Sequence, residues 1–221
     1  MRLVLAPFLS ALLVACAAPV ADPPADPPTT DPPATDPSTD PPATDPPAEP
    51  PPPAYPDGAA GTKQGLVFPD VEIEGYREGT GEWTKLAMRD YYDPDGKKGI
   101  TGVYVIVAAE WCGVCQQEAA RLPKEYPAWR ARGARFLQVL GQDSGGKPAH
   151  KAVVDRWQTR FHLGLDVGAD PKLDFMPKGA TGFPTCFVID PRTMKIVRVL
   201  PGVTSDGSIP GLEQVVTRNG G

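Results

Sequence analysis

A continuous apolar run at residues 103–109 leads directly into two cysteines that are separated by two residues. The run Val-Tyr-Val-Ile-Val-Ala-Ala is rich in β-branched residues, which is typical of a strand buried on both faces. A helical pattern follows from about Cys112 to Arg132 and contains Pro123. A strand buried on both faces needs covering layers above and below it. This junction therefore restricts the chain to an α/β architecture.

The other patterns alternate strands with helices and end in a hairpin and a helix. Strands are predicted at 66–76, 134–140, 163–167, 185–189 and 195–200, a strand with a short helical turn at 83–92, and helices at 149–161 and 209–218. This order predicts a central mixed β-sheet flanked by helices.

Proline and acidic residues are concentrated before residue 58. More than half of the 29 prolines lie between Pro19 and Pro56, where the charged residues are all acidic. Such a segment has too few apolar residues to offset the entropy of ordering, so residues 16–57 are predicted to form a disordered tether. Residues 58–221 are predicted to form one domain. Acidic and basic residues nearly balance there, which excludes a strongly basic nucleic-acid binder.

The first fifteen residues have the composition of an export signal. Arg2 precedes an apolar stretch that ends at Ala15 and is too short to span a bilayer as a helix. The sequence Leu-Val-Ala-Cys at its end resembles the lipobox of bacterial lipoproteins, whose cysteine, here Cys16, becomes lipidated. The resemblance implies a signal peptide at 1–15 and an exported, lipid-anchored protein that faces the periplasm. Ala17 after the cysteine favours the outer membrane, and an ordinary cleaved signal peptide is the alternative.

The two closely spaced cysteines are the predicted reactive groups. The start of a helix offers unpaired amide hydrogens and the positive end of the helix dipole, which stabilise a thiolate at Cys112. Cys115 would lie one turn further along, near enough to attack a mixed disulfide. We therefore expect Cys112 to be an exposed nucleophile and Cys115 to be a more buried resolving thiol. A structural disulfide is an alternative, and so is a zinc site, although the other candidate ligands are scattered singly: Cys186, His150 and His162.

A second motif, Gly-Phe-Pro-Thr at 182–185, stands directly before the apolar strand that begins at 185. Together with Trp111 and the cysteine pair, it resembles the thioredoxin-like superfamily, in particular its TlpA/ResA-like branch of redoxin domains. The resemblance implies that Pro184 follows a cis peptide bond and packs against the cysteine pair. It also implies that the backbone of Phe183 pairs with a substrate segment and that Trp111 shields the pair. The alternative is a proline that merely begins a strand.

The resemblance covers about residues 65–219. It implies a thioredoxin-like fold with an N-terminal extension at 66–92 and an inserted helix and strand at about 149–168. Glu118 matches a glutamate that this branch often carries near the resolving cysteine. A buried carboxylate there would accept the proton of Cys115. A glutamate on a solvated helix face is the alternative.

The chain also departs from thioredoxins proper. Ile106 stands where those proteins carry a buried aspartate, and Gly113-Val114 replaces Gly-Pro between the cysteines. Cys186 is expected to be a core residue without a partner, because free cysteine is among the most buried residue types. Glu110 is given no role.

The resemblance implies a lipid-anchored thiol–disulfide oxidoreductase. Cys112 would form a mixed disulfide with a protein partner, and Cys115 would resolve it. No bound cofactor or metal is required, because the electrons reside on the cysteine pair. We expect a monomer that receives electrons from an upstream thiol donor.

Three alternatives stay open. A peroxiredoxin-type thiol peroxidase would carry Thr-x-x-Cys, but Ala109 occupies the threonine position. A copper-handling metallochaperone of thioredoxin fold would use Cys-x-x-x-Cys and a distal histidine, for which His150 or His162 is available. A tethered binding protein would keep the disulfide for structure alone.

Overall fold

The computed structural model describes residues 51, 53–180, 182–202, 204 and 206–221. The predicted signal peptide, Cys16 and nearly all of the predicted tether lie outside the described residues. Within the described ranges, no helix is both long enough and apolar enough to cross a bilayer.

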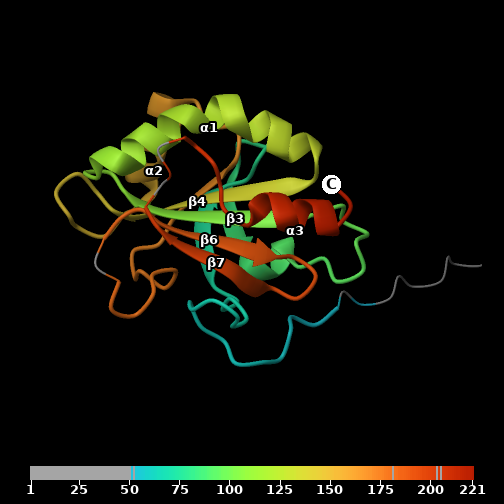
Figure 1. Cartoon of the computed structure of the whole chain (residues 1–221). Coiled ribbons are helices and arrows are strands. Elements are labelled where there is room, and N and C mark those ends of the chain that lie inside the picture. Colours follow the sequence, from blue (N-terminus) through green and yellow to red (C-terminus); the bar gives the residue numbers. More distant parts are fainter. Residues whose placement is uncertain (1–50, 52, 181, 203, 205) are drawn as a thin grey trace, which may run out of the picture. The chain divides into compact units, whose positions relative to one another are not determined.

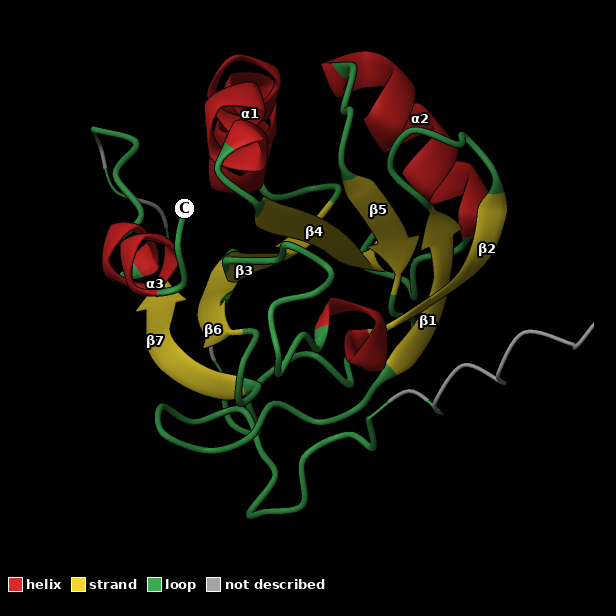
Figure 2. Cartoon of the chain, turned by 90° about the vertical axis from the view of Figure 1, so that its right-hand side faces the viewer, coloured by secondary structure: helices red, strands yellow, loops and turns green. Residues whose placement is uncertain are grey.

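Within the described residues, seven strands form one mixed sheet in the order β2-β1-β5-β4-β3-β6-β7 (Figure 2). Figure 1 shows the side of the sheet that ends in β6 and β7. The strands are β1 (Glu72–Tyr76), β2 (Trp83–Ala87), β3 (Gly102–Ala109), β4 (Ala134–Gln142), β5 (Asp166–Ala169), β6 (Thr185–Asp190) and β7 (Lys195–Pro201). The helices are α1 (Gly113–Ala131), α2 (Lys151–Phe161) and α3 (Leu212–Arg218), with a 3-10 helix η1 (Met88–Tyr91). Strands β3, β4 and β5 are parallel, whereas the other pairings are antiparallel. The predicted mixed sheet is confirmed.

The central strand β3 is buried at every position, as its sequence predicts. Tyr104, Ile106 and Ala108 pack on the face that α1, α2 and α3 cover. The opposite face is covered by η1 and by loops, and no long helix among the described residues lies on it (Figure 2). Side chains from these connecting segments, such as Phe68 and Phe175, belong to the core on this face. Large apolar side chains from loops exclude water from the second face equally well.

The predicted N-terminal extension and the predicted insertion both exist, and they pair with each other. The extension supplies the β1–β2 hairpin, and the insertion supplies α2 and β5. Strand β1 pairs with β5, with Gly75 opposite Gly168. A Cβ atom at Gly75 would lie 2.5 Å from the carbonyl oxygen of Val167, so this close approach requires glycine. The two additions together widen the sheet along one edge.

Tyr55 packs against the folded domain, although the sequence places it in the tether. Its hydroxyl donates a hydrogen bond to the carbonyl oxygen of Phe68 at 2.8 Å. Its ring meets Tyr92 edge to face, with centroids 5.8 Å apart. Packing of the domain therefore begins a few residues before the predicted boundary at residue 58.

Candidate active site

The two cysteines of the Cys-x-x-Cys motif form a disulfide at the start of α1. Cys112 is the N-cap residue, and its Sγ accepts a hydrogen bond from the backbone amide of Cys115 at 3.1 Å. The Cα atoms are 5.2 Å apart, as expected one helical turn apart. The predicted helix start is confirmed, and its amide hydrogens face the sulfur that would become the thiolate.

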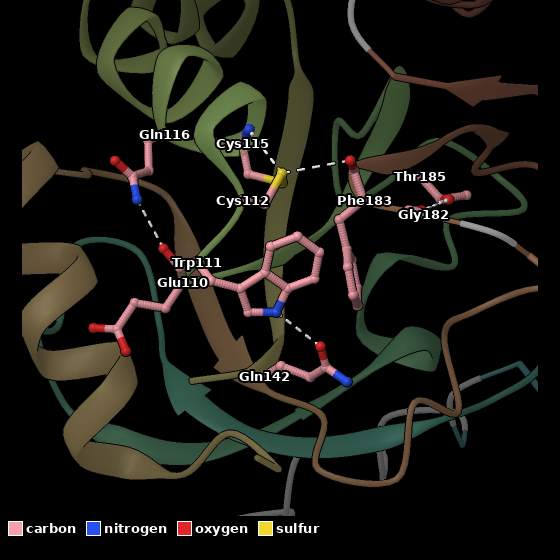
Figure 3. The surroundings of a disulfide bond; sticks show 9 residues. All are labelled: Glu110, Trp111, Cys112, Cys115, Gln116, Gln142, Gly182, Phe183 and Thr185. Atoms are coloured by element: carbon pink, nitrogen blue, oxygen red, sulfur yellow. Dashed lines mark hydrogen bonds between the residues drawn. A yellow bond between two sulfur atoms is a disulfide. The ribbon is translucent and has the colours of Figure 1, made fainter. Parts of the chain in front are cut away.

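Cys112 is more enclosed than the sequence suggested. It is only 4% exposed, and Cys115 is fully buried. The carbonyl oxygen of Phe183 lies 3.4 Å from the Sγ atom of Cys112 and covers it from the side of β6 (Figure 3). The expectation of an openly exposed nucleophile is wrong for the disulfide state, although Cys112 is still the outer of the two sulfurs.

The peptide bond between Phe183 and Pro184 is cis, as the resemblance implied. The segment that contains it is held in place from both sides. The carbonyl oxygen of Pro184 accepts a hydrogen bond from the amide of Gly202 at 2.8 Å. The hydroxyl of Thr185 donates to the carbonyl oxygen of Gly182 at 3.1 Å. This loop therefore presents its backbone beside the disulfide.

Trp111 lies at the rim of the site in a defined orientation. Its indole Nε1 donates a hydrogen bond to Oε1 of Gln142 at 2.9 Å, and its ring meets Phe183 edge to face at 5.8 Å. It is nevertheless 49% exposed, and Val114 is similarly exposed. Beside them is an open hollow of about 590 Å3, which Trp111, Gln142 and Phe183 line together with Gly182 and residues of the loop at 172–180. The surface around the disulfide is thus partly apolar and partly concave.

Glu110, which the sequence analysis gave no role, ties the turn before Trp111 to the inserted helix. Arg156 of α2 donates two hydrogen bonds to its carboxylate, at 2.9 and 2.8 Å. The amide of Ser144 donates a third at 2.9 Å. The bonds from Arg156, against partial burial, lower the pKa of Glu110. No local pattern marks this contact, because Arg156 is distant in sequence.

Glu118 is buried on α1, three residues after Cys115, which excludes the solvated helix face that stood as the alternative. It is 3% exposed, and its Oε1 accepts a hydrogen bond from the hydroxyl of Tyr104 at 3.1 Å. Burial raises the pKa of Glu118 to about 7, although the Tyr104 hydrogen bond and the nearby Arg121 act in the opposite direction. A group that titrates near neutral pH is suited to exchange a proton with a thiol.

Cys186 is a free cysteine and is buried in the core, as predicted. It lies opposite Ile106 in the β3–β6 pairing. Burial raises the pKa of the Cys186 thiol. The sequence did indicate a polar partner for Tyr104 of the same strand pair, and that partner is Glu118. A tyrosine in a strand buried on both faces needs a polar partner for its hydroxyl.

The histidines proposed for a copper site stand at opposite ends of α2. His150 is the N-cap residue and His162 is the C-cap residue. In the part of the chain that the structure describes, no three side chains of histidine, cysteine, aspartate or glutamate gather as a metal-binding group.

Comparison with known proteins identifies a matching family and solved structures with a similar fold. Residues 65–199, more than half of the chain, match the AhpC/TSA family. A search of curated proteins finds no significant match.

Solved structures with the same fold come from several bacteria. A protein described as a thiol:disulfide interchange protein DsbE from Chlorobium tepidum is 23% identical, with a TM-score of 0.51, and the match covers 75% of this chain and 99% of that one. A secreted thiol-disulfide isomerase from Corynebacterium glutamicum is 19% identical, with a TM-score of 0.51 and coverage of 67% and 84%. AhpC from Mycobacterium tuberculosis is 15% identical, with a TM-score of 0.50 and coverage of 72% and 92%.

Proposed function

Because the chain belongs to the AhpC/TSA family, we propose that Cys112 and Cys115 exchange dithiol and disulfide states with protein partners in the bacterial cell envelope. The thioredoxin-like fold and a thiol–disulfide enzyme, both expected from the sequence, are confirmed at the level of fold and family. The arrangement of the site carries the proposal. The cysteine pair stands at the start of α1, beside a cis proline, and the same helix carries a buried carboxylate.

The proposed reaction begins with the reduced pair. The Cys112 thiolate attacks a disulfide of the partner, forms a mixed disulfide and releases one partner sulfur as a thiolate. Cys115 then loses its proton to Glu118 and attacks the Cys112 sulfur, which releases the second partner sulfur. Two electrons pass from the cysteine pair to the partner, so no bound cofactor is required. An upstream thiol donor restores the reduced pair.

The partner segment is proposed to lie across Phe183 and Trp111. The Phe183 carbonyl already borders the Cys112 sulfur, and the hollow beside Trp111 accommodates side chains near the partner's cysteine. Both aromatic rings are held by neighbours, so they lose little freedom on binding. We propose that the protein acts as a monomer.

The decisive test asks which thiol reacts first. In the reduced full-length protein at pH 7, a small alkylating reagent should modify Cys112 much faster than Cys115 or Cys186, as read by peptide mapping. Cys115→Ser should trap a mixed disulfide with glutathione, and Cys112→Ser should trap none. First reaction at Cys115, or equal reaction of all three thiols, would refute the assignment of the nucleophile.

A thiol peroxidase is the second candidate, because the same fold occurs in AhpC from Mycobacterium tuberculosis. Its weakness here is Ala109 in place of the threonine of Thr-x-x-Cys. The two functions separate in one assay. An oxidoreductase reduces insulin disulfides much faster than it consumes hydrogen peroxide, whereas a peroxidase shows the reverse order.

The place of action is also part of the proposal. The N-terminal lipobox pattern suggests export and lipid attachment at Cys16, with the domain facing the periplasm from the outer membrane. The likeness in fold to a secreted protein is compatible with export. Two or three acyl chains would anchor the protein stably, whereas one alone would not.

Metabolic labelling with palmitate tests the anchor. The wild-type protein should incorporate the label, and Cys16→Ala should abolish it, whereas Cys186→Ala should leave it unchanged. Label that persists in Cys16→Ala would exclude attachment at this cysteine. Fractionation of the envelope then distinguishes the outer from the inner membrane.

A further inference from the structure

Tyr104 of β3 reaches into the space behind α1 and meets Glu118 there. Its ring packs edge to face against Phe136, with centroids 5.2 Å apart, and Phe136 packs in turn on Tyr126 at 4.9 Å. Tyr104 is 2% exposed. The ring therefore has little freedom to move, and its hydroxyl has a fixed position from which it donates to Oε1 of Glu118 at 3.1 Å.

The two oxygens of the Glu118 carboxylate are not equivalent. Oε1 is held by Tyr104, whereas Oε2 is buried and has no hydrogen-bond partner among the described residues. Cys115 precedes Glu118 by three positions on α1, and both are buried on the helix face that packs against the sheet. Side chains three apart on a helix are neighbours. Oε2 is thus the carboxylate oxygen that carries no other hydrogen bond among the described residues.

We propose that Tyr104 is a positioning residue of the resolving step, because its hydroxyl anchors one oxygen of Glu118 and leaves the other to take the proton of Cys115. The inference rests on the proposed function. In the step, a proton moves from the Cys115 sulfur to Oε2 of Glu118. The resulting thiolate forms a bond with the Cys112 sulfur, and the bond between Cys112 and the partner breaks with its electron pair on the partner's sulfur.

The charged and titratable groups around Glu118 give the sign of the expected effect. Arg121 on α1 favours the carboxylate, and Glu125 on the same helix disfavours it. Cys186 on β6 is a buried thiol of raised pKa and does not compete as an anion. Burial sets the pKa of Glu118 at about 7, and the Tyr104 hydrogen bond holds it below the value that burial alone would give. Loss of the hydroxyl therefore raises this pKa further.

Tyr104→Phe in the full-length protein tests the proposal. Reduced protein mixed rapidly with 5,5'-dithiobis(2-nitrobenzoate) should release thionitrobenzoate in two phases, first by attack of Cys112 and then by resolution through Cys115. We expect the first phase to be unchanged and the pH midpoint of the second to rise by about one unit. At pH 7 this corresponds to a roughly five-fold slower second phase, which recovers at higher pH.

Two controls separate positioning from packing. Glu118→Gln should remove the pH midpoint near 7 from the rate of the second phase. The double variant with Tyr104→Phe should then show the same second phase as Glu118→Gln alone. Cys186→Ala should leave the midpoint in place, because Tyr104 still donates to Glu118. A midpoint that stays fixed in Tyr104→Phe, or an equal rate loss at every pH, would overturn the proposal.

A second variant covers the case in which Tyr104→Phe does not fold. Site-specific 3-fluorotyrosine at position 104 keeps the ring and makes the hydroxyl a stronger donor, so the midpoint should move to lower pH. A shift in the other direction, or none, would overturn the proposal. Absence of the first phase in the wild-type protein would instead refute the proposed function of Cys112.

Discussion

Trp111 shows how a single side chain can be exposed and still ordered. Nearly half of it is exposed, yet Gln142 holds its indole nitrogen and Phe183 supports its ring. A large apolar surface that is already fixed in place binds a partner with little loss of conformational entropy. At the residue scale, the rim of the site is therefore ordered without a bound partner, as the proposed contact with a protein substrate requires.

Replacing Trp111 by alanine should weaken the productive complex with a protein disulfide substrate. The loss of one aromatic contact, about 1 kcal/mol, corresponds to an increase in KM of about five-fold, with kcat nearly unchanged. The Tm should fall little, because the side chain is half exposed. The KM of Trp111→Phe should lie between those of the wild type and Trp111→Ala, since phenylalanine keeps the contact with Phe183 but loses the hydrogen bond to Gln142. Equal KM values for all three proteins, measured with insulin, would show that the rim does not bind the partner.

At the scale of elements, Asp166 connects the inserted strand to the N-terminal extension. Its Oδ1 accepts a hydrogen bond from the amide of Glu78 at 2.6 Å, and its Oδ2 accepts one from the hydroxyl of Tyr91. Burial raises the pKa of Asp166, and it outweighs these hydrogen bonds and the nearby Arg77. A carboxyl group with a raised folded-state pKa favours the native state most at low pH.

Asp166→Asn should reveal this dependence. The native wild-type protein holds the Asp166 proton to higher pH than the unfolded chain does, so this residue's contribution declines as pH rises above about 4. The free energy of unfolding of the wild type minus that of Asp166→Asn should therefore decrease between pH 4 and pH 7. Urea denaturation at several pH values measures the difference. A difference that is independent of pH would contradict this account.

Asp155 supplies a control of opposite sign. Despite partial burial, hydrogen bonds from Tyr76 and Lys151 lower the pKa of Asp155. The free energy of unfolding of the wild type minus that of Asp155→Asn should therefore increase as pH rises through the acid range. It should also be small, because this carboxylate is partly exposed to solvent.

At the scale of the whole molecule, the folded domain begins upstream of its first strand. Tyr55 contributes a hydrogen bond to Phe68 and an aromatic contact with Tyr92. These contacts join the end of the predicted tether to the second face of the sheet, on which the described part of the chain places no long helix. The segment at 53–57 therefore acts as part of the domain.

Two deletions distinguish tether from domain. Removing residues 22–52 should leave the Tm unchanged, because no core residue was predicted there. Removing residues 22–56 should lower the free energy of unfolding by about 1–2 kcal/mol, since the Tyr55 hydrogen bond and aromatic contact are lost. In a protein of this size the Tm should fall by about 4 °C. Tyr55→Phe in the protein that lacks only residues 22–52 should lose less stability, because the aromatic contact remains. Identical Tm values for the two deletion variants would contradict the assignment of Tyr55 to the domain.

Local patterns determined much of this protein. The apolar run before the cysteines predicted β3, and the spacing of Cys112 and Cys115 predicted a helix that starts at the pair. The Gly-Phe-Pro-Thr motif, through its family resemblance, implied the cis peptide bond at Pro184. These features depend on neighbouring residues in the chain, so periodicity, propensity and resemblance were sufficient to predict them.

The tertiary structure decided the contacts between distant segments. Three such contacts join residues that no local pattern connects. They are the pairing of β1 with β5, the hydrogen bonds from Arg156 to Glu110 and the hydrogen bond from Tyr104 to Glu118. It also decided that Cys112 is enclosed and that Glu118 is buried with a pKa of about 7. Burial and proton affinity depend on which groups the folded chain brings around a side chain. That is why the sequence alone left the environment of the carboxylate open.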